Sequence, residues 1–353
     1  MRDKDTVLLE SAYTCVQKKC RCSICGKVFE DEVFEESASN SCNGYIIFHG
    51  SNYVCIATNV YQESKNPKTG NMVQVYIIPS EMAPSEAIKQ GRDSIVCFDC
   101  KHRGTRDPQT GKMSGRTCYV NPMNLNQVYK TYKKGNYPII IKNKNLLKQL
   151  KGNDGDVGMY LKNGNWDVFA DKYVRFGAYG EPVKIPFPIL EKIAQSCQGF
   201  TSYTHQWSKG VFQGYKQYCM ASVDTAEEYE KAKSLGWRTF RVSPSWYNKA
   251  ANEEACQFSV DGTQCVNCLK CSGTTSNDKD IYVAVHGSGN KVDSFIESFG
   301  TENDFSEPLT QEDLEKIKQI EKLESEEVKG EKKNKVSDLE IFNKARQDNK
   351  NFS

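Results

Sequence analysis

A strand–helix–strand pattern in residues 220–242 constrains the fold more than any other feature of this chain. An apolar run of strand length is followed by a helical segment at 226–235 and then by a second apolar run. Thr225 and Glu228 form a capping box in front of the helix, and Gly236 lies where helices end in a left-handed residue. Because such units are nearly always right-handed crossovers between parallel strands, the pattern predicts a parallel sheet.

Apolar runs of strand length recur through residues 46–300, and several are separated by helical stretches. They lie at residues 73–78, 173–178, 200–204, 218–223, 238–242 and 281–285. The length of this region is close to the ~250 residues of a typical (β/α) barrel. The runs are too few for a closed barrel of eight strands. We therefore expect an α/β fold, a partial (β/α) barrel of about six parallel strands with small metal-stapled Cys-rich loops. Apolar runs at 45–48, 53–57 and 138–141 are expected to form hairpins on it.

Charge and hydropathy exclude several classes of protein. The chain has 353 residues, enough to bury a full core, so its 15 cysteines are not needed as disulfides for folding. Lys plus Arg number 47 against 45 Asp plus Glu, so only a local basic patch would bind a nucleic acid. No apolar run approaches the ~20 residues that cross a bilayer, and the first residues lack a signal peptide's apolar stretch. We expect a soluble cytoplasmic protein with no membrane partner.

The two ends of the chain differ in composition from the region between them. Residues 1–45 hold several cysteines among charged residues and are expected to form a Cys-rich, zinc-knuckle-like module. Residues 301–353 are rich in Glu, Lys, Asn and Gln, with a thin apolar stripe from Leu314 to Leu323. Such a segment buries little surface, so we expect a charged tail that is partly helical or disordered.

Cysteines gather in three groups whose spacing is typical of metal ligands. The first group is Cys20, Cys22, Cys25 and Cys42, with Cys15 as an alternative partner. The second group is Cys97, Cys100 and Cys118, with His102 nearby, and the third is Cys256, Cys265, Cys268 and Cys271. In a reducing compartment, cysteines at two-residue spacing indicate metal ligation rather than disulfides.

The spacing leaves the identity of the metal open. Cys22-x2-Cys25 has the spacing of a zinc knuckle. The run from Cys265 through Cys268 to Cys271 matches the tight chelate of an iron–sulfur cluster, with Cys256 as the fourth ligand. Four thiolates also suit tetrahedral zinc. The predicted cofactor is therefore an iron–sulfur cluster or zinc.

Polar side chains follow the predicted strands, at the end where a parallel barrel carries its chemistry. The predicted catalytic residues are Arg175, His205, Asp224, Arg241 and His286, and the predicted cofactor-binding residues are Gly180 and Glu181. We expect all of them around one pocket, with the second cysteine group at its rim. Because an unpaired arginine in an apolar strand is costly, Glu181 and Asp224 are the expected counter-ions of Arg175 and Arg241. A structural ion-pair network is the alternative.

Several segments resemble an uncharacterised, largely phage-encoded protein family. They are TGNMVQ at 69–74, CxxCKHR at 97–103, CYV at 118–120, VRFGAYG at 174–180, YTHQW at 203–207, MASVD at 220–224 and GWRTFRV at 236–242. The resemblance covers roughly residues 60–290. The family usually has Gly-Asp-Pro where this chain has Gly180-Glu181-Pro182. The resemblance implies a phage protein in the host cytoplasm and no particular activity.

A second, weaker resemblance is to the radical S-adenosylmethionine enzymes. Their partial six-strand barrel has a three-cysteine loop after the first strand and a Gly-Gly-Glu-Pro-type turn after the second. Here the order is similar, with Cys97, Cys100 and Cys118 before Gly180-Glu181-Pro182. The usual CxxxCxxC loop is replaced by CxxC followed much later by a single cysteine. This resemblance implies an iron–sulfur cluster and S-adenosylmethionine as cofactors, with Glu181 on the latter.

Two functions follow from these observations. The first is an iron–sulfur enzyme of radical S-adenosylmethionine type that acts on an unknown small molecule. The second is a zinc-stapled nucleic-acid-binding or structural phage protein without catalysis. In the second, a basic stretch would contact nucleic acid, made up of Lys101, His102, Arg103, Arg106, Lys112 and Arg116.

Overall fold

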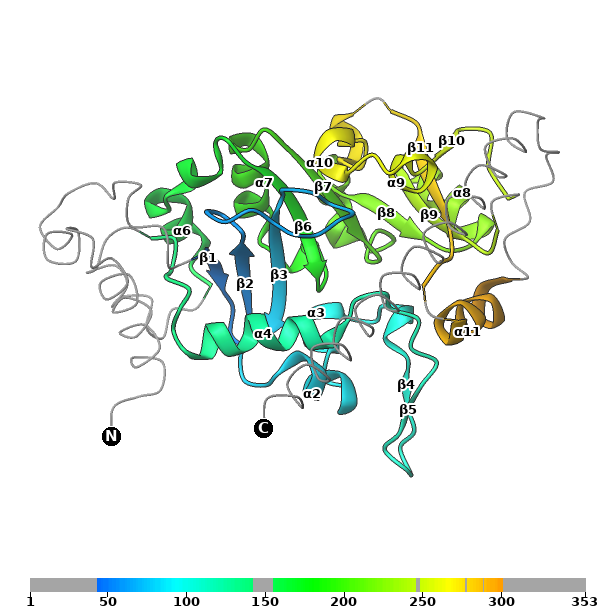
Figure 1. Cartoon of the computed structure of the whole chain (residues 1–353), viewed down its shortest axis with the longest axis horizontal. Coiled ribbons are helices and arrows are strands. Elements are labelled where there is room, and N and C mark those ends of the chain that lie inside the picture. The colour runs from blue at the N-terminus through cyan, green and yellow to red at the C-terminus, as the bar shows by residue number, and fades with distance from the viewer. Residues whose placement is uncertain (1–42, 142–154, 246–247, 277, 288, 301–353) are drawn as a thin grey trace, which may run out of the picture.

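The described part of the chain is organised around a nine-stranded sheet (Figure 1). In this computed structural model the described residues are 43–141, 155–245, 248–276, 278–287 and 289–300. The predicted N-terminal module and charged tail lie almost entirely outside them, including Cys20, Cys22, Cys25 and Cys42.

Most of the sheet is parallel. In spatial order the strands are β1 (Gly44–His49), β2 (Tyr53–Thr58), β3 (Val73–Pro79), β6 (Tyr173–Tyr179), β7 (Gly199–Thr204), β8 (Met220–Val223), β9 (Thr239–Ser243), β11 (Asp280–Ala284) and β10 (Glu253–Ala255). Every pair from β3 to β10 is parallel, whereas β1, β2 and β3 pair antiparallel. The predicted α/β class is confirmed, and β3, β6, β7, β8, β9 and β11 correspond to the six predicted strands.

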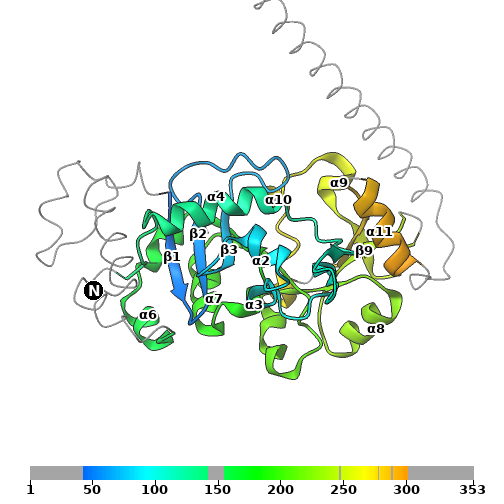
Figure 2. The same cartoon turned by 90° about the horizontal axis from the view of Figure 1, so that it is seen from below.

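Helices cover both sides of the sheet. They are α2 (Pro84–Lys89), α3 (Ser94–Cys97), α4 (Pro122–Lys133), α6 (Val157–Asn163), α7 (Phe187–Ser196), α8 (Ala226–Ser234), α9 (Gln257–Asp261), α10 (Cys265–Cys268) and α11 (Gly289–Phe299). Figure 2 shows α6, α7 and α8 on one side of the sheet and α4 and α10 on the other. Short 3-10 helices are η2 (Lys101–Arg103), η3 (Trp166–Phe169), η4 (Pro182–Lys184), η5 (Gly210–Gln217) and η6 (Gly273–Thr275).

The crossover helix α8 forms as its sequence predicts. The Thr225 hydroxyl accepts a hydrogen bond from the backbone N–H of Glu228 at 3.1 Å, and Gly236 has φ +77° directly after the helix. The Glu228 carboxylate accepts from the backbone N–H of Asp224 at 2.9 Å, which closes the capping box one residue early. Asp224, which follows β8 and directly precedes the N-cap Thr225, therefore has a fixed position.

Two details of the sheet differ from the sequence prediction. The predicted hairpins do not lie on top of the sheet, because β1 and β2 extend its edge beyond β3. Residues 138–141 form no full strand and make only isolated bridges, from Ile139 to Ile46 and from Ile141 to Gly164. The short strand β10 was missed because its residues Glu253–Ala255 are mostly charged and too few for a periodic pattern.

The two faces of the parallel sheet have different surroundings. On one face α7 buries Ile189, Leu190 and Ile193 against the sheet, where Phe176 and Phe200 are also buried. The opposite face carries larger, half-buried side chains, namely Tyr76, Arg175, Tyr203 and Phe240. We call this opposite face the inner face. Tyr203 and Phe240 of this face line a pocket together with the third cysteine group.

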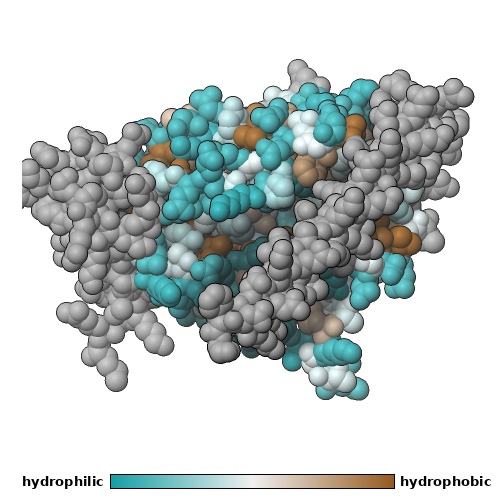
Figure 3. Space-filling model, viewed as in Figure 1, coloured by the Kyte–Doolittle hydropathy of each residue, from teal (hydrophilic) through white to brown (hydrophobic). Residues whose placement is uncertain are grey.

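The surface shows little sign of a broad apolar contact area. Figure 3 shows hydrophilic residues over most of the described surface on this side, with apolar residues scattered among them. The exposed large hydrophobic residues of the described chain are Tyr119, Met123, Val211 and Ile296. Isolated residues of this kind are normal on a protein surface.

Candidate functional site

Three cysteines converge beyond the C-terminal end of β3. Cys97 ends α3, Cys100 precedes η2, and Cys118 follows the small hairpin of β4 (Thr105–Arg106) and β5 (Met113–Ser114). The backbone N–H of Cys100 donates to the backbone oxygen of Cys97 at 3.1 Å. The backbone N–H of Cys118 donates to the backbone oxygen of His102 at 3.1 Å. Burial, followed by the charges of Glu181, Cys118 and Cys100, raises the pKa of Cys97. The three thiols are therefore neighbours, as a shared metal site requires.

The loop between the first two cysteines is held by an arginine. The Arg103 guanidinium donates to the backbone oxygens of Phe98 at 2.9 Å and Gly91 at 2.8 Å, and pairs with Asp93 at 2.7 Å. Phe98 has φ +51°, in the left-handed region that is unfavourable for a residue with a side chain. Such strain persists only where surrounding contacts fix the backbone, so the Cys97–Cys100 turn is preorganised.

Tyr179 places a buried hydroxyl beside these thiols. It ends β6, its side chain is 3% exposed, and its hydroxyl has no hydrogen-bond partner among the described residues. Burial, together with the nearby Cys97, Asp93 and Cys118, raises its pKa, so the hydroxyl stays protonated. A buried hydroxyl without an acceptor is costly. The donor would be satisfied by the sulfur of a metal-bound thiolate or of a cluster.

The turn Gly180-Glu181-Pro182 joins the cysteine loop to the sheet. Gly180 has φ +77°, and a Cβ there would lie 2.6 Å from the backbone oxygen of Ile77, so this position needs glycine. The backbone N–H of Glu181 donates to Val96, which directly precedes Cys97, at 2.9 Å. The turn after β6 and the cysteine loop after β3 are therefore in direct contact.

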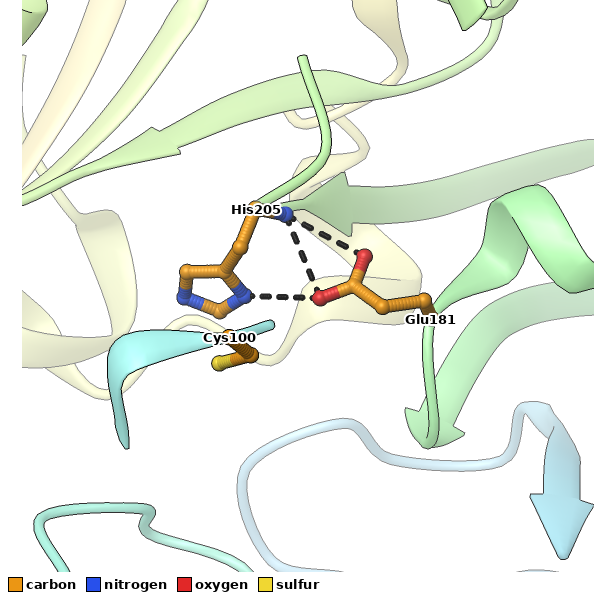
Figure 4. A group of neighbouring side chains, drawn as sticks. All are labelled: Cys100, Glu181 and His205. Atoms are coloured by element: carbon orange, nitrogen blue, oxygen red, sulfur yellow. Dashed lines mark hydrogen bonds and ion pairs between the residues drawn. The ribbon is translucent and has the colours of Figure 1, made fainter. Parts of the chain in front are cut away.

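Glu181 and His205 form the centre of the site (Figure 4). The buried Glu181 carboxylate accepts from the Thr204 hydroxyl at 2.6 Å and from the His205 backbone N–H at 3.2 Å, and lies 3.0 Å from His205 Nδ1. Burial alone would lower the pKa of His205, but Cys100 and Glu181 raise it well above its usual value. The ligand atoms of Cys100, Glu181 and His205 lie within 4.8 Å of one another, close enough for one metal ion.

A second set of charged residues adjoins His205. The His102 ring lies 4.9 Å from the His205 ring, and its two nitrogens contact Thr117 at 2.6 Å and Asp224 at 2.9 Å. Lys101 also pairs with Asp224, at 2.9 Å. Burial alone would raise the pKa of Asp224, but His102 and Lys101 lower it below its usual range. Asp224 is therefore an ionised carboxylate inside the protein.

An open hollow of ≈ 370 Å³ brings solvent to this cluster. It is lined by Lys101, Trp207, Ser208, Thr225, Glu227, Glu228, Lys231, Ser298 and Phe299. The Lys101 ammonium lies over the Phe299 ring of α11, 4.5 Å from its centroid. His102, by contrast, is packed beneath Phe295 and Phe299. The lysine is the member of the cluster that faces the hollow.

The third cysteine group lines a separate pocket on the inner face. Cys256, Cys265, Cys268 and Cys271 surround it together with Tyr203 of β7 and Phe240 of β9. The Tyr203 and Cys271 side chains lie next to each other in this pocket. The four cysteines that the sequence grouped are thus neighbours in the structure.

Of the predicted catalytic residues, the structure brings two together with Glu181. His205 and Asp224 are linked through His102, and β6 and β7, which carry Glu181 and His205, are parallel. His286 lies further out, with its ring 5.4 Å from that of Tyr119 and Nδ1 2.9 Å from the backbone oxygen of Ala284.

The predicted counter-ions of the two arginines were wrong. Arg241 pairs with Glu253 at 2.6 Å, and both side chains are fully buried. Glu181 and Asp224 are instead engaged by histidines. Arg175 has no ion pair or hydrogen bond among the described residues, and its buried Nε lacks a partner. The pairing of Arg241 with Glu253 was not predicted because Glu253 lies in β10, the strand that pattern analysis missed.

Sequence reasoning undervalued three residues of the site. His102 was placed near the second cysteine group and in the nucleic-acid-binding stretch, although it contacts Asp224 directly. Lys101 was assigned to a nucleic-acid-binding stretch, yet it pairs with Asp224 and Glu228. Tyr179 directly follows the predicted strand at 173–178 and was given no role of its own. The signal for His102 and Lys101 was available, because both follow Cys100 directly.

Comparison with protein-family models, curated proteins and solved structures found no match. In the described residues, no helix is both long and apolar enough to cross a membrane.

Proposed function

We propose that the chain is an iron–sulfur enzyme of radical S-adenosylmethionine type, built on a partial barrel of parallel strands. The observation that carries this proposal is the order of elements. Strands β3, β6, β7, β8, β9 and β11 are neighbours in the same order as in the sequence. The cysteine loop follows the first of them and the Gly180-Glu181-Pro182 turn follows the second. In parallel α/β folds, binding sites lie at the carboxyl ends of the strands, where both of these segments meet.

The residues present fit an iron–sulfur cluster. Cys97, Cys100 and Cys118 offer three neighbouring thiols, and the Tyr179 hydroxyl beside them lacks a hydrogen-bond partner among the described residues. A cluster held by three thiolates leaves one iron open to a further ligand. An iron–sulfur cluster and S-adenosylmethionine together supply radical chemistry to the enzymes that bind them.

The surrounding side chains have separable roles in this proposal. Glu181 provides an anionic carboxylate next to Cys100, suited to a cationic amino group, and His205 fixes its orientation through two contacts. Thr204 donates to the same carboxylate at 2.6 Å. Lys101 faces the open hollow and is oriented by Asp224. A lysine at that position can bind an anionic group of a small-molecule substrate.

Anaerobic purification tests the proposal directly. We expect a brown protein with broad absorption near ~400 nm, containing iron and acid-labile sulfide. Reduced with dithionite, it should release methionine from added S-adenosylmethionine. Cys100→Ser should abolish that release, whereas Cys197→Ser, which removes a thiol outside all three groups, should not. A cysteine group that holds zinc alone, with no methionine release, would reject the enzyme.

A zinc-stapled nucleic-acid-binding protein is the second candidate, favoured by one observation. The β4–β5 hairpin projects from the body of the protein and carries exposed Arg106 and Lys112 (Figure 1). The rest of the predicted basic stretch is engaged internally: Lys101 with Asp224, Arg103 with Asp93, and Arg116 with the backbone oxygens of Cys118 and Val120. Two exposed cations support only weak phosphate contact, so the enzyme is the better proposal.

A further inference from the structure

The third cysteine group lies on the inner face of the sheet, in a setting built to hold it. The backbone N–H of Cys256 donates to the backbone oxygen of Tyr282 in β11 at 2.9 Å. The backbone N–H of Cys265 donates to the backbone oxygen of Lys68 at 3.0 Å. The N–H of Ser202 in β7 donates to the Cys271 backbone oxygen at 3.0 Å. Three segments that are distant in the sequence therefore fix the backbone of three of the cysteines.

Arg238 and two backbone conformations complete this setting. The Arg238 guanidinium donates to the backbone oxygens of Lys270 at 2.9 Å and Gly273 at 2.8 Å, on either side of Cys271. Leu269, between Cys268 and Cys271, has φ +54°. Gly273 has φ +66°, and a Cβ there would lie 2.7 Å from the backbone of Cys219. Left-handed residues at these points wrap the chain tightly around the pocket.

The spacing of the sulfur atoms favours a cluster over a single ion. Around tetrahedral zinc, Zn–S bonds of ~2.3 Å place the sulfurs less than ~4 Å apart. Among the described residues, the sets of three ligand atoms that lie within 4.8 Å of one another include no three of these four thiols. All four nevertheless line one pocket. Thiolates that bind different irons of one cluster are spread more widely than thiolates on one ion.

The charge next to this group lacks a partner. Arg175 pairs in register with Thr201, which lines the pocket, and it is the cation that acts most strongly on the Cys265 sulfur. Its guanidinium makes no ion pair or hydrogen bond among the described residues. A buried guanidinium nitrogen without a partner is costly, and an anion in the pocket would satisfy it.

We propose that Cys256, Cys265, Cys268 and Cys271 bind an iron–sulfur cluster whose negative charge is balanced by Arg175. The Tyr203 hydroxyl donates to the Cys271 thiolate. His205, which directly follows β7 and is two residues beyond Tyr203, lies next to Cys100. Two residues of extended chain span at most ~7 Å, so Tyr203 at one cysteine group and His205 at the other lie close together. This cluster at the third cysteine group does not depend on S-adenosylmethionine chemistry at the second group.

Metal analysis of the full chain tests the site. The anaerobic protein should hold more iron than one cluster can, above ~4 per chain, with matching sulfide. Cys268→Ser should lose about half of the iron and of the ~400 nm absorption, as should Cys100→Ser at the other group. The control Cys197→Ser should lose none. Iron retained in Cys100→Ser and lost in Cys268→Ser would support this site even if the proposed enzyme fails. Zinc in the wild type, with iron unchanged by Cys268→Ser, would overturn it.

A charge variant tests the site without removing any of its cysteines, in case Cys268→Ser does not fold. In the Cys100→Ser background only the cluster at the third cysteine group should give an electron paramagnetic resonance signal during a redox titration. Arg175→Met should lower the reduction potential of this cluster, because the reduced cluster loses a stabilising positive charge. Arg175→Lys keeps the positive charge, so the potential should stay close to that of the protein with Arg175. A potential that is the same in all three proteins would overturn the role of Arg175.

Discussion

The two described cysteine groups differ in how the chain holds them. Cys256, Cys265, Cys268 and Cys271 lie within a short stretch of sequence, and backbone hydrogen bonds and the Arg238 guanidinium fix them. Cys97, Cys100 and Cys118 are separated by a projecting hairpin and are surrounded by ionisable side chains. The arrangement of the third group suits a metal centre that must stay complete. The arrangement of the second group suits a metal centre that exchanges ligands and protons.

The surroundings of the two groups support the same distinction. Glu181, His205, His102, Asp224 and Lys101 form a connected set of charges beside Cys100. Next to the third group the charged side chains mainly support the backbone, as Arg238 does, or pair with each other, as Lys270 and Glu254 do at 2.8 Å. Arg175 is the exception. Ionisable groups with shifted pKa values gather where chemistry takes place.

The largest expected effect comes from breaking a support of the third group. Glu253 begins β10, three residues before Cys256, and its buried carboxylate pairs with Arg241 at 2.6 Å. Removing one partner of a buried ion pair leaves an uncompensated charge, so Glu253→Gln should destabilise the protein by about 3–5 kcal/mol. Chemical denaturation, followed by metal release, measures it. The third group should lose its metal at a lower denaturant concentration than the second group.

Release of metal from both cysteine groups at the same denaturant concentration would contradict the proposed independence of the two centres. The matched control is Glu254→Gln, one residue away, whose half-exposed pair with Lys270 is worth little.

A smaller effect is expected from the charged set beside the second group. Asp224→Asn removes the ion pairs with His102 and Lys101, and hydrogen bonds to a charged group contribute about 1.5–3 kcal/mol. The sign of the pH dependence follows from the lowered pKa of Asp224. The folded state binds this proton less readily than the unfolded chain does, so the carboxylate stabilises the protein above the unfolded pKa of about 4. That stabilisation is lost as the pH falls below ~4.

Thermal unfolding at several pH values measures this contribution. The wild type should lose stability faster than Asp224→Asn on acidification from pH 5 to pH 3, and the two melting temperatures should approach each other. Parallel curves would show that Asp224 is not ionised in the folded protein.

The sequence was informative where structure depends on local pattern. The helix α8, its capping box at Thr225 and the glycine at Gly236 follow from neighbouring residues, and they were predicted correctly. The grouping of four cysteines around one pocket was also predictable, since close spacing in the sequence forces proximity.

Contacts between distant segments were not predictable in the same way. The pairing of Arg241 with Glu253 depends on the register of β9, β11 and β10. Likewise, His102 reaches Asp224 across more than a hundred residues. Strand-end position indicated that Glu181, His205 and Asp224 would be close, because parallel strands end at one edge. It did not indicate which of their charges would pair, since side-chain reach and loop path decide that.

The smallest expected effect tests whether the two cysteine groups respond to a loss of overall stability or only to the loss of contacts at each site. The Thr225 hydroxyl caps α8 directly after Asp224, and Thr225→Ala should cost about 1 kcal/mol. The Glu228 carboxylate would still accept from the Asp224 N–H and pair with Lys101 at 2.6 Å, so Asp224 should keep its place. Thr225→Ala should therefore lower the melting temperature without changing the absorption spectrum of either cysteine group. If it altered the spectrum of the second group as much as Asp224→Asn does, the charged set would act through the stability of α8 rather than through its contacts at the site.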